Sequence, residues 1–149
     1  MKDFLATMYE LLRSFYGQDL ADHLYGLNHN NTGAYDEQSL YVPIGLTMLI
    51  MSIVLPLLYY KIVDKPSLAN FKVWFILALI HVVINIFIGF WLPYLDWDTG
   101  KMAKVVHDAI GSGNCWGFGM ANGIFAFIYF LLVSYLVKRF STNSKTIPF

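Results

Sequence analysis

Two hydrogen-bonding side chains, His81 and Asn85, lie one helical turn apart in the middle of the apolar run FILALIHVVINIFIGFW at residues 75–91. A segment of this composition is suited to lipid, where each polar group needs a partner inside the protein. Such side chains either hold neighbouring helices together or line a polar path. Because histidine titrates near neutral pH, His81 is a candidate for a proton-responsive group as well as for a structural contact.

Other polar side chains are expected at the same depths as these two. Counting along the apolar runs at about 1.5 Å per residue places Asn122 of the third run and Thr47 of the first near the level of Asn85. The same count places Tyr129 and Ser52 near the level of His81. We therefore predict two polar layers, an outer one of Thr47, Asn85 and Asn122 and an inner one of Ser52, His81 and Tyr129.

Pro56 lies inside the first apolar run and predicts a kink close to the inner layer. A proline within a helix removes the hydrogen bond to the carbonyl four residues earlier, which here belongs to Ser52. In lipid that carbonyl needs another donor, and His81 or Tyr129 is placed to supply one.

Small residues indicate where the helices pack. In a helix Gly89 shares a face with His81 and Asn85, and small residues on such a face let two helices approach closely. The third run carries a GxxxG motif, Gly119 to Gly123, on the face that also holds Asn122. The predicted packing residues are Gly89, Gly119, Gly123 and Ala126.

The remaining reactive side chains do not form a recognisable catalytic or metal site. His107, Asp108 and Cys115 contain the groups of a nucleophilic site, but no local motif joins them. The four histidines lie on different segments without ligand spacing, and a single cysteine excludes an all-cysteine metal site. We therefore expect no enzymatic activity, no bound metal and no cofactor.

Composition and hydropathy predict an all-α integral membrane protein. Only 13% of the 149 residues are charged, whereas a soluble domain carries about 25%. Three uncharged apolar runs, at about residues 41–60, 73–95 and 116–137, reach the roughly 20 residues that a bilayer requires. Aromatic residues such as Trp74 and Trp97 flank them, as they do at membrane interfaces. The three runs define a membrane domain at 41–140, followed by a C-terminal tail at 141–149.

Residues 1–40 are expected to form an N-terminal amphipathic helix and a connector. Apolar residues from Phe4 to Tyr16 recur at helical spacing, and Asp3 is placed to cap the helix. A helix of this length lies on the membrane or packs on the bundle and does not cross it. Lys and Arg residues in the 61–72 connection and after residue 137 favour a cytoplasmic C-terminus and an N-terminus outside.

These patterns favour an oligomeric, channel-like or pore-forming subunit for ions or small solutes, with the polar layers as its lining. The alternative is a non-conducting membrane scaffold or accessory subunit that docks on a larger partner. A pore needs polar layers in contact with water, whereas a scaffold would bury them. The expected partners are the lipid bilayer and either further copies or a larger membrane complex. Nucleic acid is not expected, because the net charge is zero.

Overall fold

The computed structural model describes residues 1–27, 38–62, 68–99 and 104–143. These residues form helices joined by turns and short connections, and they contain no strand. The connector at 28–37 and the tail from residue 144 onward, including Lys145, lie outside the described residues, as do Lys65 and its neighbours at 63–67.

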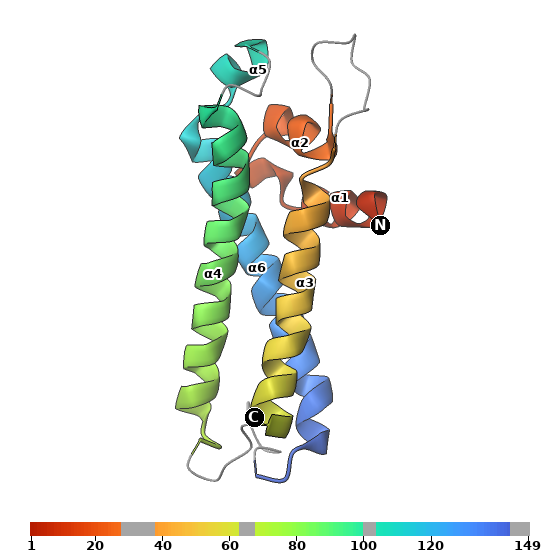
Figure 1. Ribbon diagram of the computed structural model, residues 1–149, viewed down its shortest axis with the longest axis vertical. Helices are drawn as coiled ribbons and strands as arrows, with labels where there is room; N and C mark the ends of the chain where they lie inside the picture. The colour runs from red at the N-terminus through yellow and green to blue at the C-terminus, as the bar shows by residue number, and fades with distance from the viewer. Residues whose placement is uncertain (28–37, 63–67, 100–103, 144–149) are drawn as a thin grey trace.

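Three long helices form the body of the molecule (Figure 1): α3, Tyr41–Leu57; α4, Phe71–Asp98; and α6, Ser112–Val137. All three are long and apolar enough to cross a membrane, over Tyr41–Lys61, Phe71–Asp98 and Ser112–Phe140. Each range expected from the sequence falls inside one of these three continuous segments. The prediction of three apolar helices of membrane-spanning length is therefore confirmed.

Helix α6 is the central element of the bundle. It packs extensively against both α4 and α3, whereas α3 and α4 contact each other much less. Figure 1 shows α6 crossing behind the gap between the other two long helices. Side chains that join the bundle therefore converge on α6.

The lower ends of α3 and α6 change helix type. One residue after Pro56 the α-helical pattern of α3 ends, and the chain continues as a π-helical turn, η2, Leu58–Ile62. Helix α6 continues as a short 3-10 helix, η3, Lys138–Phe140. Tyr59 and Tyr60 of η2 pack with Trp74 of α4 in an apolar cluster at this end.

The N-terminal arm is two helices, where the sequence suggested one. Helix α1, Lys2–Glu10, is followed by a 3-10 turn, η1, Arg13–Phe15, and by α2, Gln18–Tyr25. Gly17, between η1 and α2, has φ +84°, a conformation that favours glycine and ends the helical pattern there. The expected cap is also wrong, because Asp3 accepts a hydrogen bond of 2.7 Å from Tyr25 and α1 begins without a side-chain cap.

The arm docks on the upper half of the bundle, with α1 lying across the side of α3 (Figure 1). A large apolar cluster joins it to the long helices, and its fully buried members include Leu5, Tyr9, Tyr16, Tyr41 and Phe118. A short helix, α5, Lys104–Ala109, lies above the end of α4. The arm and α5 thus make one end of the molecule broader than the other.

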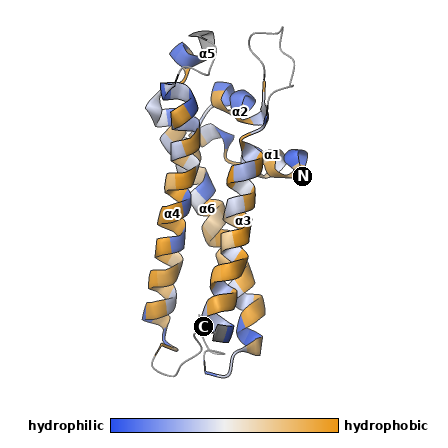
Figure 2. Ribbon diagram, viewed as in Figure 1, coloured by the Kyte–Doolittle hydropathy of each residue, from blue (hydrophilic) through white to orange (hydrophobic). Residues whose placement is uncertain are grey.

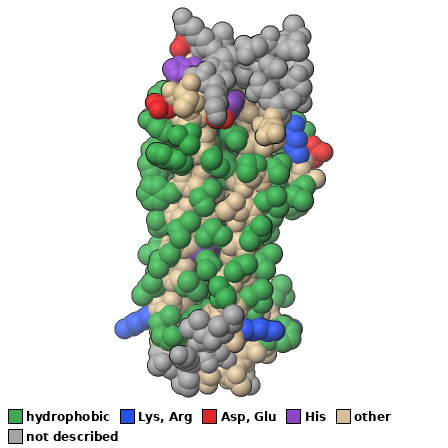
Figure 3. Space-filling view, in the orientation of Figure 1, with side chains coloured by type: hydrophobic (Ala, Val, Ile, Leu, Met, Phe, Trp, Pro, Cys, Tyr) green, Lys and Arg blue, Asp and Glu red, His purple; other side chains and the backbone are tan. Residues whose placement is uncertain are grey.

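The surface of the long helices is apolar, and charge is confined to the two ends. Figure 2 shows hydrophobic residues along the length of α3, α4 and α6. Figure 3 shows Lys and Arg side chains at the lower end and also at the right of the upper part, whereas acidic and histidine side chains lie mostly near the upper end. This distribution is typical of a protein whose middle section faces lipid.

Candidate functional site

A chain of buried polar groups runs through the interior of the bundle and begins at His81 of α4. The side chain of His81 has no solvent exposure, and its Nε2 lies 3.0 Å from the Ser52 hydroxyl of α3. Its Nδ1 lies 3.1 Å from Nδ2 of Asn85. An amide nitrogen only donates, so Nδ1 accepts, and the hydrogen on Nε2 is donated to Ser52. His81 is therefore held as one neutral tautomer.

Asn85 continues the chain one turn further along α4. Its Nδ2 also donates to the carbonyl of His81 at 2.9 Å, which fixes the orientation of the amide. Its Oδ1 is fully buried and has no hydrogen-bond partner among the described residues. An unpartnered buried acceptor costs about 1–3 kcal/mol, so this atom is the weak point of the network.

Asn122 of α6 links Asn85 to the N-terminal arm. Its Nδ2 donates to the backbone carbonyl of Asn85 at 2.8 Å, and its Oδ1 accepts a hydrogen bond of 2.6 Å from the hydroxyl of Tyr9. The amide nitrogen of Asn122 thus bonds to α4, and its amide oxygen bonds to α1. The network consequently joins α3, α4, α6 and α1 in the interior of the bundle.

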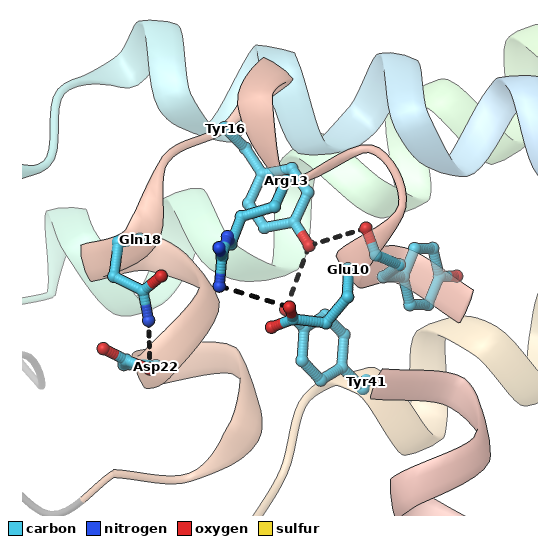
Figure 4. Close-up of polar contacts among 7 residues, drawn as sticks. Glu10, Arg13, Tyr16, Gln18, Asp22 and Tyr41 are labelled. Atoms are coloured by element: carbon cyan, nitrogen blue, oxygen red, sulfur yellow. Dashed lines mark hydrogen bonds and ion pairs between the residues drawn. The ribbon is translucent and has the colours of Figure 1, made fainter. Parts of the chain in front are cut away.

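The upper end of the network is a group of buried tyrosines. The hydroxyl of Tyr16 donates to the carbonyl of Tyr9 at 3.1 Å, so the 3.1 Å contact between the two hydroxyls requires Tyr41 to donate to Tyr16. Figure 4 shows this arrangement beside the exposed Arg13–Glu10 pair and the Gln18–Asp22 hydrogen bond. Burial raises the pKa of Tyr16 to about 12 and also raises the pKa of Tyr9. Both hydroxyls therefore remain protonated and available as donors at neutral pH.

Two members of the expected layers are placed differently from the prediction. The hydroxyl of Thr47 donates to the carbonyl of Pro43 in its own helix, at 2.8 Å, and is not bonded to either asparagine. Tyr129 is half-buried, and no hydrogen bond joins it to His81 or Ser52 in the described part of the chain. The ring that packs on His81 is that of Phe130, with centroids 5.5 Å apart.

His81 contacts a different atom of Ser52 from the one that the sequence predicted. His81 meets the hydroxyl of Ser52, whereas the sequence suggested its carbonyl. The same hydroxyl lies 3.5 Å from the carbonyl of Ala126, so Ser52 connects α4 with α6. Ala126, expected among the packing residues, is fully buried and lies on the α3 side of α6 through this contact.

The three expected packing glycines lie where α4 crosses α6. A Cβ atom at Gly89 would lie 2.9 Å from Cβ of Asn122, and one at Gly119 would lie 2.6 Å from the backbone oxygen of Ile86. A Cβ at Gly123 would lie 2.5 Å from Cγ1 of Ile86. The two helices approach so closely that a methyl group does not fit without movement, and this approach brings Asn122 within reach of Asn85.

The contacts between the arm and the long helices were not predicted from the sequence. A Cβ at Gly117 of α6 would lie 1.8 Å from the carbonyl oxygen of Phe15, and one at Gly45 of α3 would lie 2.7 Å from Leu5. Asn114 adds a hydrogen bond of 2.8 Å from its Nδ2 to the carbonyl of Tyr16. The available signal was the spacing of Leu5 and Tyr9, which share one face of α1.

The candidate nucleophilic residues do not form a compact buried site. Cys115 is fully buried in the upper apolar cluster, whereas Asp108 is exposed and His107 is partly exposed. The ring of His107 stacks on Trp97 at 5.2 Å, and its Nδ1 lies 3.5 Å from Asp108. Among the described residues, no three His, Cys, Asp or Glu side chains are grouped as metal ligands.

The fold and the network define an all-helical protein in which three helices have the length and composition to cross a membrane. No family model, no curated protein and no solved structure matches the chain. The geometry of the polar network and of the surface around it is therefore the basis for inferring a function.

Proposed function

We propose that the protein is an integral membrane subunit that does not conduct ions and acts as a scaffold or accessory subunit for other membrane proteins. In this proposal α3, α4 and α6 cross the bilayer, and the polar network holds them in register. The observation that carries the proposal is the burial of the network inside one chain. His81, Asn85, Asn122 and Ser52 have no solvent-exposed surface.

The outer surface of the long helices supports the same function. A pore that conducts ions is lined by groups that replace the water around the ion. Within residues 50–58, 75–91 and 116–132 every exposed side chain is apolar. Copies of this chain arranged around a central axis would thus present apolar walls, which favours the scaffold over the channel-like subunit.

The energetics of the network suit a structural role. Interhelical hydrogen bonds in membranes average about 0.6 kcal/mol each, so they select one arrangement of helices more than they add stability. The contacts of Asn122 with Asn85 and of Ser52 with His81 fix the vertical register of α6 and α3 relative to α4. A subunit that presents a defined surface to partners needs such a fixed register.

The charges suggest how the subunit is oriented. Lys61, Lys72, Lys138 and Arg139 lie at the lower end of the long helices, next to short connections. The positive-inside rule assigns this end, with the C-terminus, to the cytoplasmic side. The N-terminal arm would then lie on the outside.

A hollow on the lipid-facing side of α4 and α6 is the surface we assign to a partner's transmembrane helix. It measures about 360 Å³ and is lined entirely by apolar side chains, among them Phe75, Val82 and Phe127. Ala78 and Gly123 form its base, where α4 and α6 pack against each other.

Ion flux through proteoliposomes tests the non-conducting part of the proposal. Wild type, Asn85→Leu and His81→Leu are compared at acidic and neutral pH, after each is shown to be folded and monodisperse. We expect no flux above that of empty liposomes for any variant. Flux in the wild type that either substitution abolishes would overturn the proposal in favour of a pore.

A photo-crosslinking amino acid at Phe127 tests the assembly part in cell membranes. The matched control carries the same amino acid at Ile53, which is exposed on α3 away from the hollow. We expect a discrete adduct of fixed mass from position 127 and none from position 53. Adducts with lipid alone at both positions would refute a partner at this surface.

A further inference from the structure

The side chains of α1 fall into three sectors around the helix, at about 100° per residue. The charged residues Lys2, Asp3 and Glu10 share one sector of roughly 100°. Leu5, Met8 and Tyr9 form a second sector, which is buried against the bundle, and Ala6, which is also buried, lies within the charged sector. The third sector is apolar and yet exposed, with Phe4 at 59% and Leu11 at 76% of full exposure.

Helix α1 thus has a buried sector, a charged sector and an exposed apolar sector, an arrangement that suits a helix at a membrane surface. Lys2 and Asp3 both contact Tyr25 of α2, which lies above α1 in Figure 1, so the charged sector faces the upper end of the molecule. The exposed apolar sector is centred roughly 140° away around α1 and faces the lower part of the bundle. Amphipathic helices at membrane surfaces place charged residues toward water and apolar residues toward the acyl chains. We propose that the exposed apolar surface of the arm, made of Met1, Phe4, Leu11 and Phe15, binds the acyl chains of the surrounding phospholipids.

The contacts with the long helices fix the depth of the arm. Phe15 meets α6 at Gly117, five residues from the start of that helix, which corresponds to about 8 Å along its axis. Leu5 meets α3 at Gly45, four residues and about 6 Å from its start. Helix α6 is about 39 Å long and a hydrocarbon core is about 30 Å thick, so each end projects by roughly 4–5 Å. The arm therefore lies close to the boundary between headgroups and acyl chains.

The aromatic residues at the same level agree with this depth. Trp116 directly precedes Gly117 and is 43% exposed, and tryptophan is enriched at membrane interfaces. The arm meets α6 beside this residue, and Figure 1 shows α1 projecting outward from the side of α3. In a bilayer a segment that projects sideways at this level is surrounded by lipid, and Figure 2 shows hydrophobic residues on α1.

The inference rests on the membrane insertion in the proposed function, but not on the scaffold role. A depth measurement separates the two. Spin labels are placed one at a time at Leu11→Cys, Glu10→Cys, Gln18→Cys and Ile80→Cys in a Cys115→Ala background, in phosphatidylcholine bilayers. Collision rates are compared for oxygen, which concentrates in lipid, and for a water-soluble nickel chelate. Ile80, 50% exposed in the middle of α4, is the lipid reference, and Gln18, exposed on α2, is the aqueous reference.

We expect the ratio of oxygen to nickel collisions at Leu11 to be several-fold higher than at Glu10 or Gln18 and to approach that at Ile80. Nickel collisions at Leu11 as frequent as at Gln18, with Ile80 protected, would overturn the lipid contact of the arm while leaving membrane insertion intact. Nickel access at Ile80 as well would overturn membrane insertion and the inference together.

Discussion

The hydroxyl of Tyr9 donates a hydrogen bond of 2.6 Å to the side-chain oxygen of Asn122, although 113 positions separate the two residues in the chain. The same asparagine donates to the backbone of Asn85. One buried amide thus connects the N-terminal arm with two long helices. Because every atom involved is shielded from water, loss of either partner has no compensation from solvent.

Substitution of Tyr9 by Phe removes the donor and leaves the Asn122 oxygen buried and unpaired. We expect a loss of about 1–3 kcal/mol in the free energy of unfolding. We also expect faster trypsin cleavage after Arg13, since the arm is released more often. Tyr135→Phe, which changes an exposed tyrosine of α6, is the control and should leave both measurements unchanged. Equal stability of the Tyr9→Phe variant and the wild type would show that the bond contributes nothing.

The second prediction follows from the close approach of Phe15 to Gly117. A Cβ at position 117 would lie 1.8 Å from a backbone oxygen, so Gly117→Ala forces η1 away from α6. Gly113→Ala is the matched control, because nothing lies within 4 Å of a Cβ there. We expect the first variant to increase tryptic cleavage after Arg13. The second should keep the arm docked and gain up to about 1 kcal/mol from helix propensity. Similar cleavage of the two variants would contradict the observed contact.

The two glycines of the GxxxG motif are expected to differ in their tolerance of alanine. At Gly119 the new methyl group meets a backbone oxygen of Ile86 at 2.6 Å, whereas at Gly123 it meets the side chain of Ile86 at 2.5 Å. A side chain can change rotamer, but a helical backbone cannot move without shifting the helix. Gly119→Ala should therefore lower the melting temperature in detergent more than Gly123→Ala does. The reverse order would place the closest approach of α4 and α6 at Gly123.

Alkaline pH should release the arm through Tyr16. Burial raises the pKa of this phenol to about 12 in the folded protein, above its usual value near 10. Between these values the unfolded chain loses its proton while the folded chain keeps it, so stability falls as pH rises from about 10 to 12. Tryptic cleavage after Arg13, preceded by a brief incubation at each pH, should increase over this window. Tyr16→Phe removes this titration and should make the increase shallower; an identical profile would exclude Tyr16 as its source.

The long helices and half of the polar network follow from the sequence by simple arguments. Hydropathy and length identify the three helices of membrane-spanning length, because an apolar helix has few alternatives to lipid or a large core. The constant rise of a helix was enough to pair Asn122 with Asn85 and Ser52 with His81, since antiparallel neighbours share levels. Axial position is robust, because an error of one residue shifts a side chain by only about 1.5 Å.

The direction in which a side chain points around the helix axis is predicted less well from the sequence. An error of one residue turns a side chain by about 100°, and Phe130 accordingly takes the place expected for Tyr129. The hydroxyl of Thr47 donates a hydrogen bond within its own helix, as any threonine hydroxyl in a helix can. The depth of a residue in the bundle does not predict this bond. The docking of the arm through Gly117 and Tyr9 depends on contacts across about a hundred residues, which no local pattern encodes.

The contact between the first and last helices also orders the events of biosynthesis. Asn122 is synthesised 113 residues after Tyr9, a delay of about 6–20 s at ordinary elongation rates. During this interval α3 can cover Leu5 and Tyr9 in part, through Gly45 and Tyr41, but the α6 surface at Phe118 and Phe125 has not yet been made. The docking of α1 is therefore completed only after α6 has been synthesised.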